Sequence, residues 1–346
     1  MVVAIEWVRN PRPHIRLIDQ TVLPGAVQYL EITTVTDLVA AIQSLAVRGA
    51  PALGAAGALG VVVAMNQGEQ EGWDEAELQR NVDLVRDARP TAVNLAWGVN
   101  EVRHAIPEGA DRVLELAQRV VDEDGAANRE LSRLGADWIL DATGREQVRV
   151  VTHCNTGALA TTAWGTAYGI IHELHERGRL GLVYADETRP LLQGSRLTSW
   201  ELTQDGIDHV IQADGAAAST ILRGLVDVAI IGADRITANG DTANKVGSVT
   251  LALACERAGI PFVVAAPYST VDAGTATGED IHIEERAALE VLELGGVRTA
   301  PATARAFNPA FDVTPHDLIS AIVTEQGVVV PARSGGGALF ADLVNQ

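Results

Sequence analysis

The stretch that decides the fold is Val148-Arg149-Val150-Val151-Thr152-His153-Cys154-Asn155-Thr156-Gly157. It joins a short apolar run to a polar turn that contains glycine, and comparable runs recur toward the C-terminus. The short apolar runs are 148–152, 182–185, 209–212, 228–231 and 262–266. Stretches with a helical pattern separate them, for example at 158–177, 197–204 and 247–258. This alternation predicts repeated βαβ units, and therefore an α/β fold with a doubly wound parallel sheet.

The chain before this stretch is predicted to be mainly helical. Apolar residues recur with a helical period over 37–46, where Thr36 could serve as the N-cap. Pro51 suits the first turn of a second helix, whose Ala- and Gly-rich sequence would allow close packing. Amphipathic patterns follow over 78–85 and 111–140. We therefore expect a mainly helical domain over residues 1–145 and a parallel-sheet domain over residues 146–346.

Composition narrows the class of protein. The 346 residues are 47% hydrophobic, enough for two cores, and the net charge of -19 disfavours nucleic acid as a partner. Uninterrupted apolar runs such as 59–65 are shorter than the roughly 20 residues that cross a bilayer, so no membrane span is expected. The N-terminus lacks the pattern of a secretion signal, so the cytoplasm is the expected compartment. Cys154 and Cys255 are expected to be free thiols.

Two polar residues follow predicted strands, at the sheet edge where doubly wound folds bind ligands. Cys154 follows the first strand, and a helix starting just after it would favour its thiolate, although a buried structural cysteine is the alternative. His153 should point away from the thiol, because neighbours in extended chain face opposite sides. Asp234 follows a wholly apolar strand, so partly dry surroundings could keep it protonated as a proton donor. A simple loop cap is its alternative role.

Other candidate groups are weaker. Asn244-Lys245 is expected at the start of a helix, where Lys245 would suit a phosphate, and the polar loop 186–194 is expected to be a binding edge. His172 and His175 lie three residues apart on a predicted helix, but no third ligand has clear spacing, so no metal is expected. The sequence contains neither a Walker phosphate loop nor a dinucleotide fingerprint, so no nucleotide cofactor is expected.

Ordered motifs along almost the whole chain resemble those of one family. They are VRGAPA at 47–52, ARPTAVNL at 88–95, THCN at 152–155, ETRP at 187–190 with Gln193-Gly194, GADR at 232–235, Asn244-Lys245, and NPAFDVTP at 308–315. Together they resemble the methylthioribose-1-phosphate isomerases, within the larger family that includes the regulatory subunits of translation initiation factor 2B.

This resemblance implies a helical N-terminal domain with a small sheet, a Rossmann-like C-terminal domain, and a homodimer. It implies conversion of 5-methylthioribose 1-phosphate into 5-methylthioribulose 1-phosphate in methionine salvage, part of methionine biosynthesis, without a cofactor. Cys154 matches the family's catalytic thiol and Asp234 its proton donor. The family's substrate-binding positions correspond to Arg48, Gly49, Ala50, Arg89, Gln193, Asn244 and Lys245.

Rival functions stay open on the sequence alone. A sister isomerase would act on ribose 1,5-bisphosphate or 5-deoxyribose 1-phosphate, which differ from the first substrate only at carbon 5. A non-catalytic regulatory subunit would form stable hetero-assemblies and show no turnover. The presence of both Cys154 and Asp234 favours an enzyme.

Overall fold

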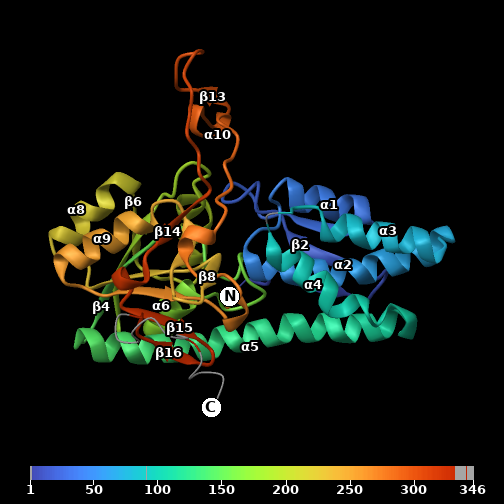
Figure 1. The fold of residues 1–346 in the computed structure, drawn as a ribbon, viewed down its shortest axis with the longest axis horizontal. Coiled ribbons are helices and arrows are strands. Elements are labelled where there is room, and N and C mark those ends of the chain that lie inside the picture. The colour runs from blue at the N-terminus through green and yellow to red at the C-terminus, as the bar shows by residue number, and fades with distance from the viewer. Residues whose placement is uncertain (1, 91, 332–339, 341–346) are drawn as a thin grey trace. The chain divides into compact units, whose positions relative to one another are not determined.

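The computed structural model describes residues 2–90, 92–331 and 340. The chain forms two compact units (Figure 1): unit 1 comprises Met1–Ala127 and Thr156–Gly165, and unit 2 comprises Asn128–Asn155 and Thr166–Gln346. The division falls inside helix α5 (Ala110–Thr143) rather than at the expected position near residue 146. The reason is that α5 supplies core residues to both units, Val113 to one core and Ile139 to another.

Unit 1 is mainly helical with a small sheet, as expected. Strands β1 (Ile5–Val8), β2 (His14–Ile18) and β3 (Tyr29–Ile32) form an antiparallel sheet in that order. Helices α1 (Val35–Gln43), α2 (Ala50–Glu71), α3 (Glu75–Arg86) and α4 (Val93–Arg103) follow, with a short 3-10 turn at Ile106–Glu108. The expected N-cap Thr36 is wrong: Thr34 caps α1, because its side chain accepts a hydrogen bond from Asp37 N at 3.1 Å.

Helix α2 is the core helix of unit 1. By length and composition alone α2 could cross a membrane, although no span was expected from the sequence. The uninterrupted apolar run 59–65 is short, but the alanines and glycines before it lengthen the apolar stretch of the helix. However, 72% of its most apolar window is buried inside the fold, as in the core helix of a soluble protein. Close packing against α4 depends on glycine: a Cβ placed on Gly98 would lie 2.0 Å from Gly54 O. This confirms the expected close approach of the Ala- and Gly-rich helix.

Unit 2 is built on a seven-stranded sheet with the order β16-β15-β10-β7-β4-β5-β6. Its strands are β4 (Val148–Thr152), β5 (Leu180–Asp186), β6 (His209–Gln212), β7 (Val228–Ile231), β10 (Phe262–Ala265), β15 (Ala321–Thr324) and β16 (Gly327–Val329). Neighbouring strands are parallel except that β16 runs antiparallel to β15. The chain builds the sheet outward on one side of β4 and then on the other, so the topological switch point lies between β4 and β7. The Rossmann-like prediction is confirmed.

Both faces of this sheet are covered by helices. One face packs against the end of α5, α6 (Ala167–Glu176) and α7 (Ser199–Gln204), and the other against α8 (Ala217–Leu222) and α9 (Ser248–Ala258). Along β7 the side chains alternate between the two cores: Ile230 faces the first and Ile231 the second. Cys255 lies fully buried in the second core, as expected, and burial raises the pKa of its thiol to about 12.

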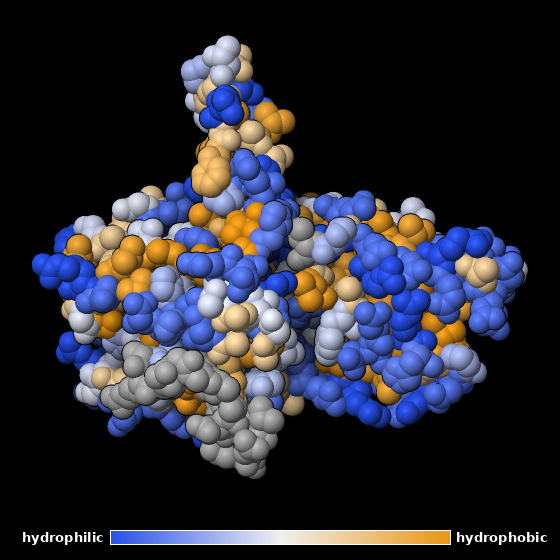
Figure 2. All heavy atoms as spheres, in the orientation of Figure 1, coloured by the Kyte–Doolittle hydropathy of each residue, from blue (hydrophilic) through white to orange (hydrophobic). Residues whose placement is uncertain are grey.

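A second sheet and a projecting arm complete unit 2. The sheet has the order β11 (Val271–Asp272), β8 (Arg235–Thr237), β9 (Thr242–Lys245) and β14 (Phe311–Thr314). The arm carries α10 (Leu289–Leu292) and the hairpin of β12 (Glu293–Leu294) and β13 (Val297–Arg298), and stands away from the rest of unit 2 at the top of Figure 1. Large apolar side chains are exposed on it (Figure 2), including Leu294, Val297 and Phe307.

Candidate active site

The two predicted catalytic residues follow neighbouring strands at the switch point of the large sheet. Strand β4 pairs with β7 in parallel, and Thr152 is the register partner of Ile230. Cys154 comes two residues after the end of β4, and Asp234 comes three residues after the end of β7. Parallel neighbours lie about 4.8 Å apart and end at the same edge, so both residues follow the carboxyl edge where doubly wound sheets bind ligands.

Cys154 occupies a tight turn that two threonine hydroxyls hold. Its φ angle is +66°, in the left-handed region that non-glycine residues seldom adopt. Cys154 N donates to Thr188 Oγ1 at 2.9 Å, and Thr198 Oγ1 donates to Cys154 O at 2.6 Å. The expected helix N-terminus beside the thiol is wrong, because the next helix, α6, begins only at Ala167. The thiol is therefore positioned by these two hydrogen bonds rather than by a helix.

Gln193 lies directly beside the thiol. Its Nε2 approaches Cys154 Sγ at 3.4 Å, and the side chain is buried. Within the described part of the chain its Oε1 atom has no hydrogen-bond partner. A buried amide oxygen without a donor is costly, and a sugar hydroxyl could supply one. The structure thus brings together two predicted site residues, Cys154 and Gln193.

Asp234 does not have the dry surroundings expected from the sequence. Its side chain is exposed, and its main-chain N donates to Ala243 O at 2.9 Å. The apolar strand β7 is buried throughout, but burial decreases after it: Gly232 is buried, Ala233 is partly buried, and Asp234 is exposed. Burial of a strand therefore does not carry over to the residue three positions beyond it.

The sequence suggested that Asn244 and Lys245 lie at the start of a helix. They lie instead at the end of β9, and the next helix, α9, begins at Ser248. Asn244 Nδ2 donates to Ser248 Oγ at 2.9 Å, and Lys245 Nζ donates to Ala310 O at 2.7 Å. The Lys245 ammonium also lies 4.5 Å from the centre of the Phe311 ring, a cation–π distance.

The N-terminus of helix α9, close to Lys245 in sequence, is already used by a carboxylate. Gly247 N donates to Asp312 Oδ2 at 2.7 Å, and Val249 N approaches the same oxygen at 3.3 Å. A negative side chain is the group that a helix N-terminus favours. Any phosphate bound by Lys245 would therefore not use these two N–H groups.

The remaining predicted binding residues belong to unit 1, where they occupy junctions between helices. Arg48 and Gly49 precede α2, whose first residue is Ala50, and Arg89 lies between α3 and α4. Gly49 has a φ of +95°, and a Cβ there would lie 2.3 Å from Ala160 O. Only glycine fits this position, because both the backbone angle and the contact exclude a side chain.

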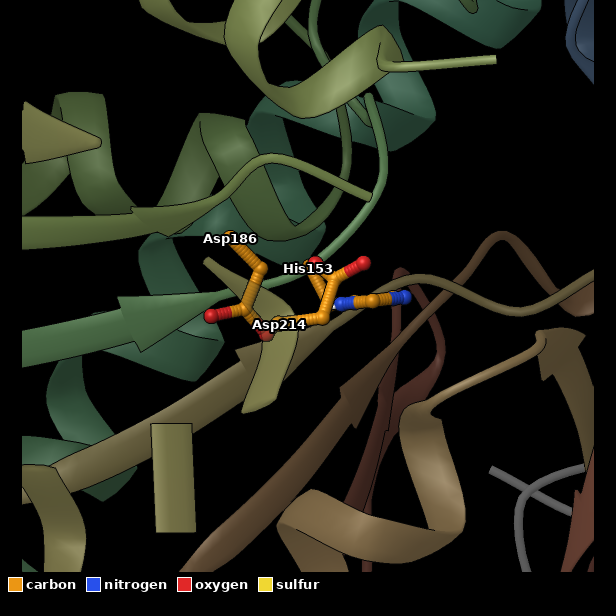
Figure 3. Close-up of side chains that lie close together, drawn as sticks. All are labelled: His153, Asp186 and Asp214. Atoms are coloured by element: carbon orange, nitrogen blue, oxygen red, sulfur yellow. Dashed lines mark hydrogen bonds and ion pairs between the residues drawn. The ribbon is translucent and has the colours of Figure 1, made fainter. Parts of the chain in front are cut away.

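The side chains of one histidine and two aspartates lie close together near the carboxyl ends of β4 and β5 (Figure 3). Ligand atoms of His153, Asp186 and Asp214 lie within 4.8 Å of one another, which would permit a metal ion. These atoms already have partners: Gln212 Nε2 donates to Asp186 Oδ1, and the main-chain N of Thr188 and of Arg189 donate to Asp214. The group is therefore satisfied by hydrogen bonds within the protein.

The two histidines that the sequence singled out on α6 do not form a comparable group. His172 is half-buried, with Nε2 3.6 Å from Asp205, whereas His175 is exposed. Of the side chains that surround Cys154, the sequence indicated Gln193 and the loop 186–194, which contains Asp186 and Thr188. It did not indicate Thr198, which ends a short π-helical turn, or the contact between His153 and Asp186, because such residues carry no distinguishing local pattern.

Comparisons with known proteins identify the family of the chain. The family model described as "Initiation factor 2 subunit family" matches residues 46–331. The "Methylthioribose-1-phosphate isomerase" of Anaeromyxobacter dehalogenans (strain 2CP-C) is 48% identical over 332 residues, 96% of this chain and 95% of that protein. The "Probable bifunctional methylthioribose-1-phosphate isomerase/methylthioribulose-1-phosphate dehydratase" of Nocardia farcinica (strain IFM 10152) is 52% identical over 313 residues. That match covers 90% of this chain, which spans only 57% of the longer protein.

Solved structures match the whole chain. The 5-methylthioribose 1-phosphate isomerase from Pyrococcus horikoshii OT3 has a TM-score of 0.88 at 36% identity, covering 100% of this chain and 96% of that one. The translation initiation factor eIF-2B, subunit delta, from A. fulgidus has a TM-score of 0.86 at 37% identity, with full coverage of both chains. The chain therefore belongs to the initiation factor 2 subunit family and, within it, to the methylthioribose-1-phosphate isomerases.

Proposed function

We propose that this protein converts 5-methylthioribose 1-phosphate into 5-methylthioribulose 1-phosphate, an aldose-to-ketose isomerisation of methionine salvage. Relatives named for this activity are 47 and 48% identical over nearly the whole chain. The observation that carries the proposal is the position of Cys154 and Asp234, a thiol and a carboxyl that follow adjacent strands at the switch point. The dehydratase named for the longer Nocardia protein is not part of the proposal.

The chemistry requires an acid and a group that moves hydrogen. Phosphate on the anomeric oxygen locks the sugar as a ring, so ring opening needs a proton on the ring oxygen. We assign this proton to Asp234 and the transfer of hydrogen between carbons 2 and 1 to Cys154. Because the Asp234 carboxyl is exposed, the donor role requires bound substrate to displace water from it. Retention of a carbon-2 deuterium in water would support a hydride shift, and its washout would support an enediol.

Substrate binding is assigned to the residues at the family's binding positions. Gln193 is the best supported, since its buried and unpartnered Oε1 lies on the same side chain that contacts the Cys154 thiol. Asn244 and Lys245, with Arg48, Gly49, Ala50 and Arg89, are proposed to bind the sugar phosphate. A homodimer in the cytoplasm, acting without a cofactor, completes the proposal.

Turnover of purified protein tests this function. Wild type is assayed with 5-methylthioribose 1-phosphate, ribose 1,5-bisphosphate and 5-deoxyribose 1-phosphate. The first should be the best substrate, and Cys154→Ala and Asp234→Asn should each reduce turnover at least about 10²-fold. Cys255→Ala is the matched control, because this buried thiol lies in the core on one face of the sheet. Near-normal turnover by either catalytic variant would refute the assigned role.

One observation favours a second function. The A. fulgidus structure, described as a translation initiation factor subunit, is as similar in fold and sequence as the Pyrococcus isomerase. A regulatory subunit would show no turnover with any of the three sugar phosphates and would form stable hetero-assemblies. A preference for one of the other two sugars would instead identify a sister isomerase.

A further inference from the structure

His153 is buried with both ring nitrogens facing oxygen atoms. The side chain is 1% exposed, Nδ1 lies 2.9 Å from Asp186 Oδ2, and Nε2 lies 2.9 Å from Val246 O. A main-chain carbonyl can only accept a hydrogen bond, so Nε2 must carry a hydrogen. The question that remains is which atom carries the hydrogen in the contact with Asp186.

Neighbouring side chains orient the carboxyl of Asp186. Thr220 Oγ1 donates to Gln212 Oε1 at 2.6 Å, which turns the Gln212 amide so that its Nε2 donates to Asp186 Oδ1 at 2.9 Å. Thr188 Oγ1 adds a hydrogen bond to the main-chain O of Asp186 at 3.0 Å. Asp186 Oδ1 thus acts as an acceptor, and one proton lies between Oδ2 and His153 Nδ1.

The charges around the ring favour the imidazolium form. Burial disfavours a charged ring, but the hydrogen bond and charge of Asp186 outweigh it and raise the pKa of His153. Interactions with Cys154 and Asp214 act in the same direction, and Asp312 also interacts with the ring. Burial raises the pKa of Asp186 as well, and His153 and Gln212 oppose that rise. We take the buried pair as imidazolium and carboxylate at neutral pH.

The ring also packs directly on the segment that follows Lys245. A Cβ placed on Gly247 would lie 2.8 Å from Cε1 of His153, and Gly247 has a φ of +113°. The glycine therefore lets the ring lie against the backbone of this segment. His153 thus links the turn after β4, which carries Cys154, to the segment after β9, which carries Lys245.

We propose that His153 is a positioning residue for the proposed isomerisation: its Nε2–H fastens the Cys154 turn to Val246 and its Nδ1–H fastens the same turn to Asp186, and together these bonds hold the thiol and Lys245 in one arrangement. This inference rests on the proposed function. The histidine acts through its neighbours and does not touch the sugar. When the ring loses the proton on Nδ1, a bare nitrogen faces the Asp186 carboxylate and this contact weakens. Because the pKa of His153 is raised, the contact should persist above the ordinary histidine value and be lost as pH rises through the raised pKa.

Nuclear magnetic resonance tests the protonation without an activity assay. Long-range ¹H–¹⁵N correlations of wild-type protein labelled at histidine, with His153 assigned by its absence in His153→Gln, count the hydrogens on the ring. Two N–H groups should be present at neutral pH and persist above the ordinary histidine value of about 6.5. In Asp186→Asn the loss of the second hydrogen should move to lower pH. A wild-type ring with one N–H at neutral pH would overturn the proposal.

Kinetics test the positioning role. His153→Gln should reduce kcat on the order of 10²-fold, as expected when a reacting group is misplaced, with a smaller change in KM. Wild-type kcat should fall at alkaline pH as the ring loses its second hydrogen, and His153→Gln should lack this fall. His209→Gln is the matched control, since His209 also binds a main-chain carbonyl, Ile207 O, but its second partner is the Ser199 hydroxyl, which can either donate or accept. A merely structural histidine would leave the pH profile unchanged in shape.

The outcomes separate this inference from the proposed function. No turnover by wild type with any of the three sugars overturns the function, and the positioning role falls with it, whereas the resonance experiment still reports the state of the ring. Active wild type with His153→Gln matching His209→Gln in kcat overturns the positioning role alone. If His153→Gln fails to fold, the His153 signal is assigned as the one that loses its second hydrogen at lower pH in Asp186→Asn, and wild-type kcat and pH profile in Asp186→Asn would overturn the positioning role.

Discussion

Replacing Thr188 by valine tests how the turn at Cys154 is held. Thr188 Oγ1 accepts a hydrogen bond from Cys154 N at 2.9 Å and donates one to Asp186 O at 3.0 Å. Valine keeps the branched shape of threonine but can make neither bond. The buried N–H of Cys154 then loses its partner at a residue whose φ of +66° is already unfavourable.

The hydrogen bond from Cys154 N and the backbone strain that it opposes are similar in energy. A buried donor left without an acceptor costs about 1–3 kcal/mol, and a left-handed backbone costs a non-glycine residue about 1–2 kcal/mol. Without the Thr188 hydroxyl, conformations in which the turn relaxes and the thiol moves become more favourable than the native turn by about the strain energy, about 1–2 kcal/mol. The free energy of unfolding should fall by about 1–3 kcal/mol. Since 1.4 kcal/mol is a factor of ten, kcat should fall about tenfold if only the native turn is active.

The assay measures kcat with 5-methylthioribose 1-phosphate alongside urea unfolding. Thr324→Val is the control: its buried hydroxyl donates to Gly327 O at 3.3 Å and accepts from Gln326 N at 3.1 Å in the β15–β16 hairpin. This variant should lose stability and keep its kcat. Thr188→Val with a wild-type kcat, despite a measured loss of stability, would show that the Cys154 turn does not depend on this bond.

Two further variants test the fold. Gly49→Ala should destabilise the protein by more than about 2 kcal/mol in urea unfolding, because the added Cβ would lie 2.3 Å from Ala160 O. Gly72→Ala is the control and should cost only about 1 kcal/mol, because Gly72 has a positive φ but no atom within 4 Å of the added Cβ. Equal losses of stability in the two variants would contradict the clash at Gly49. Burial would raise the pKa of Asp227, but hydrogen bonds from Arg149 outweigh burial and lower it. The ion pair's contribution to the free energy of unfolding is therefore fully present above the ordinary pKa of about 3.9, and it is lost as pH falls through the lowered pKa. Asp227→Asn should therefore cost about 1–3 kcal/mol at neutral pH, and its deficit should shrink in acid; a constant deficit would contradict the ion pair.

The central strands could be predicted because their surroundings leave a clear pattern. Strands buried on both faces are nearly continuous apolar runs bounded by turn residues, and β4, β6 and β7 occupy the predicted ranges. The last two strands were not predicted. Strand β15 is a buried run of four residues, as short as β6 and β7, but it leads directly into the antiparallel β16 and not into a helix, so it lies outside the βαβ alternation on which the prediction rested.

The helix predicted over 158–177 shows how side chains can override composition. Its first part is rich in alanine and threonine, yet α6 begins only at Ala167. Thr161 Oγ1 donates to the main-chain O of Gly157 and of Ala163, and Thr162 Oγ1 donates to Asp124 Oδ2 at 2.7 Å. Threonine hydroxyls that bond locally or to a neighbouring helix compete with helical hydrogen bonds. Residues 156–165 consequently become part of unit 1.

In the candidate site, the positions of the residues could be predicted from the sequence, whereas their surroundings could not. The positions of Cys154 and Asp234 follow from chain order, because a doubly wound sheet brings the ends of its first and fourth strands together. Their surroundings depend on residues far away in sequence: Thr188 holds the Cys154 turn across 34 positions, and Asp186 meets His153 across 33. Asp234 is exposed although the strand before it is buried, because exposure is set by what packs over the strand end. Chain order can therefore predict which residues lie at the carboxyl edge of the sheet, whereas the burial and orientation of their side chains depend on tertiary contacts.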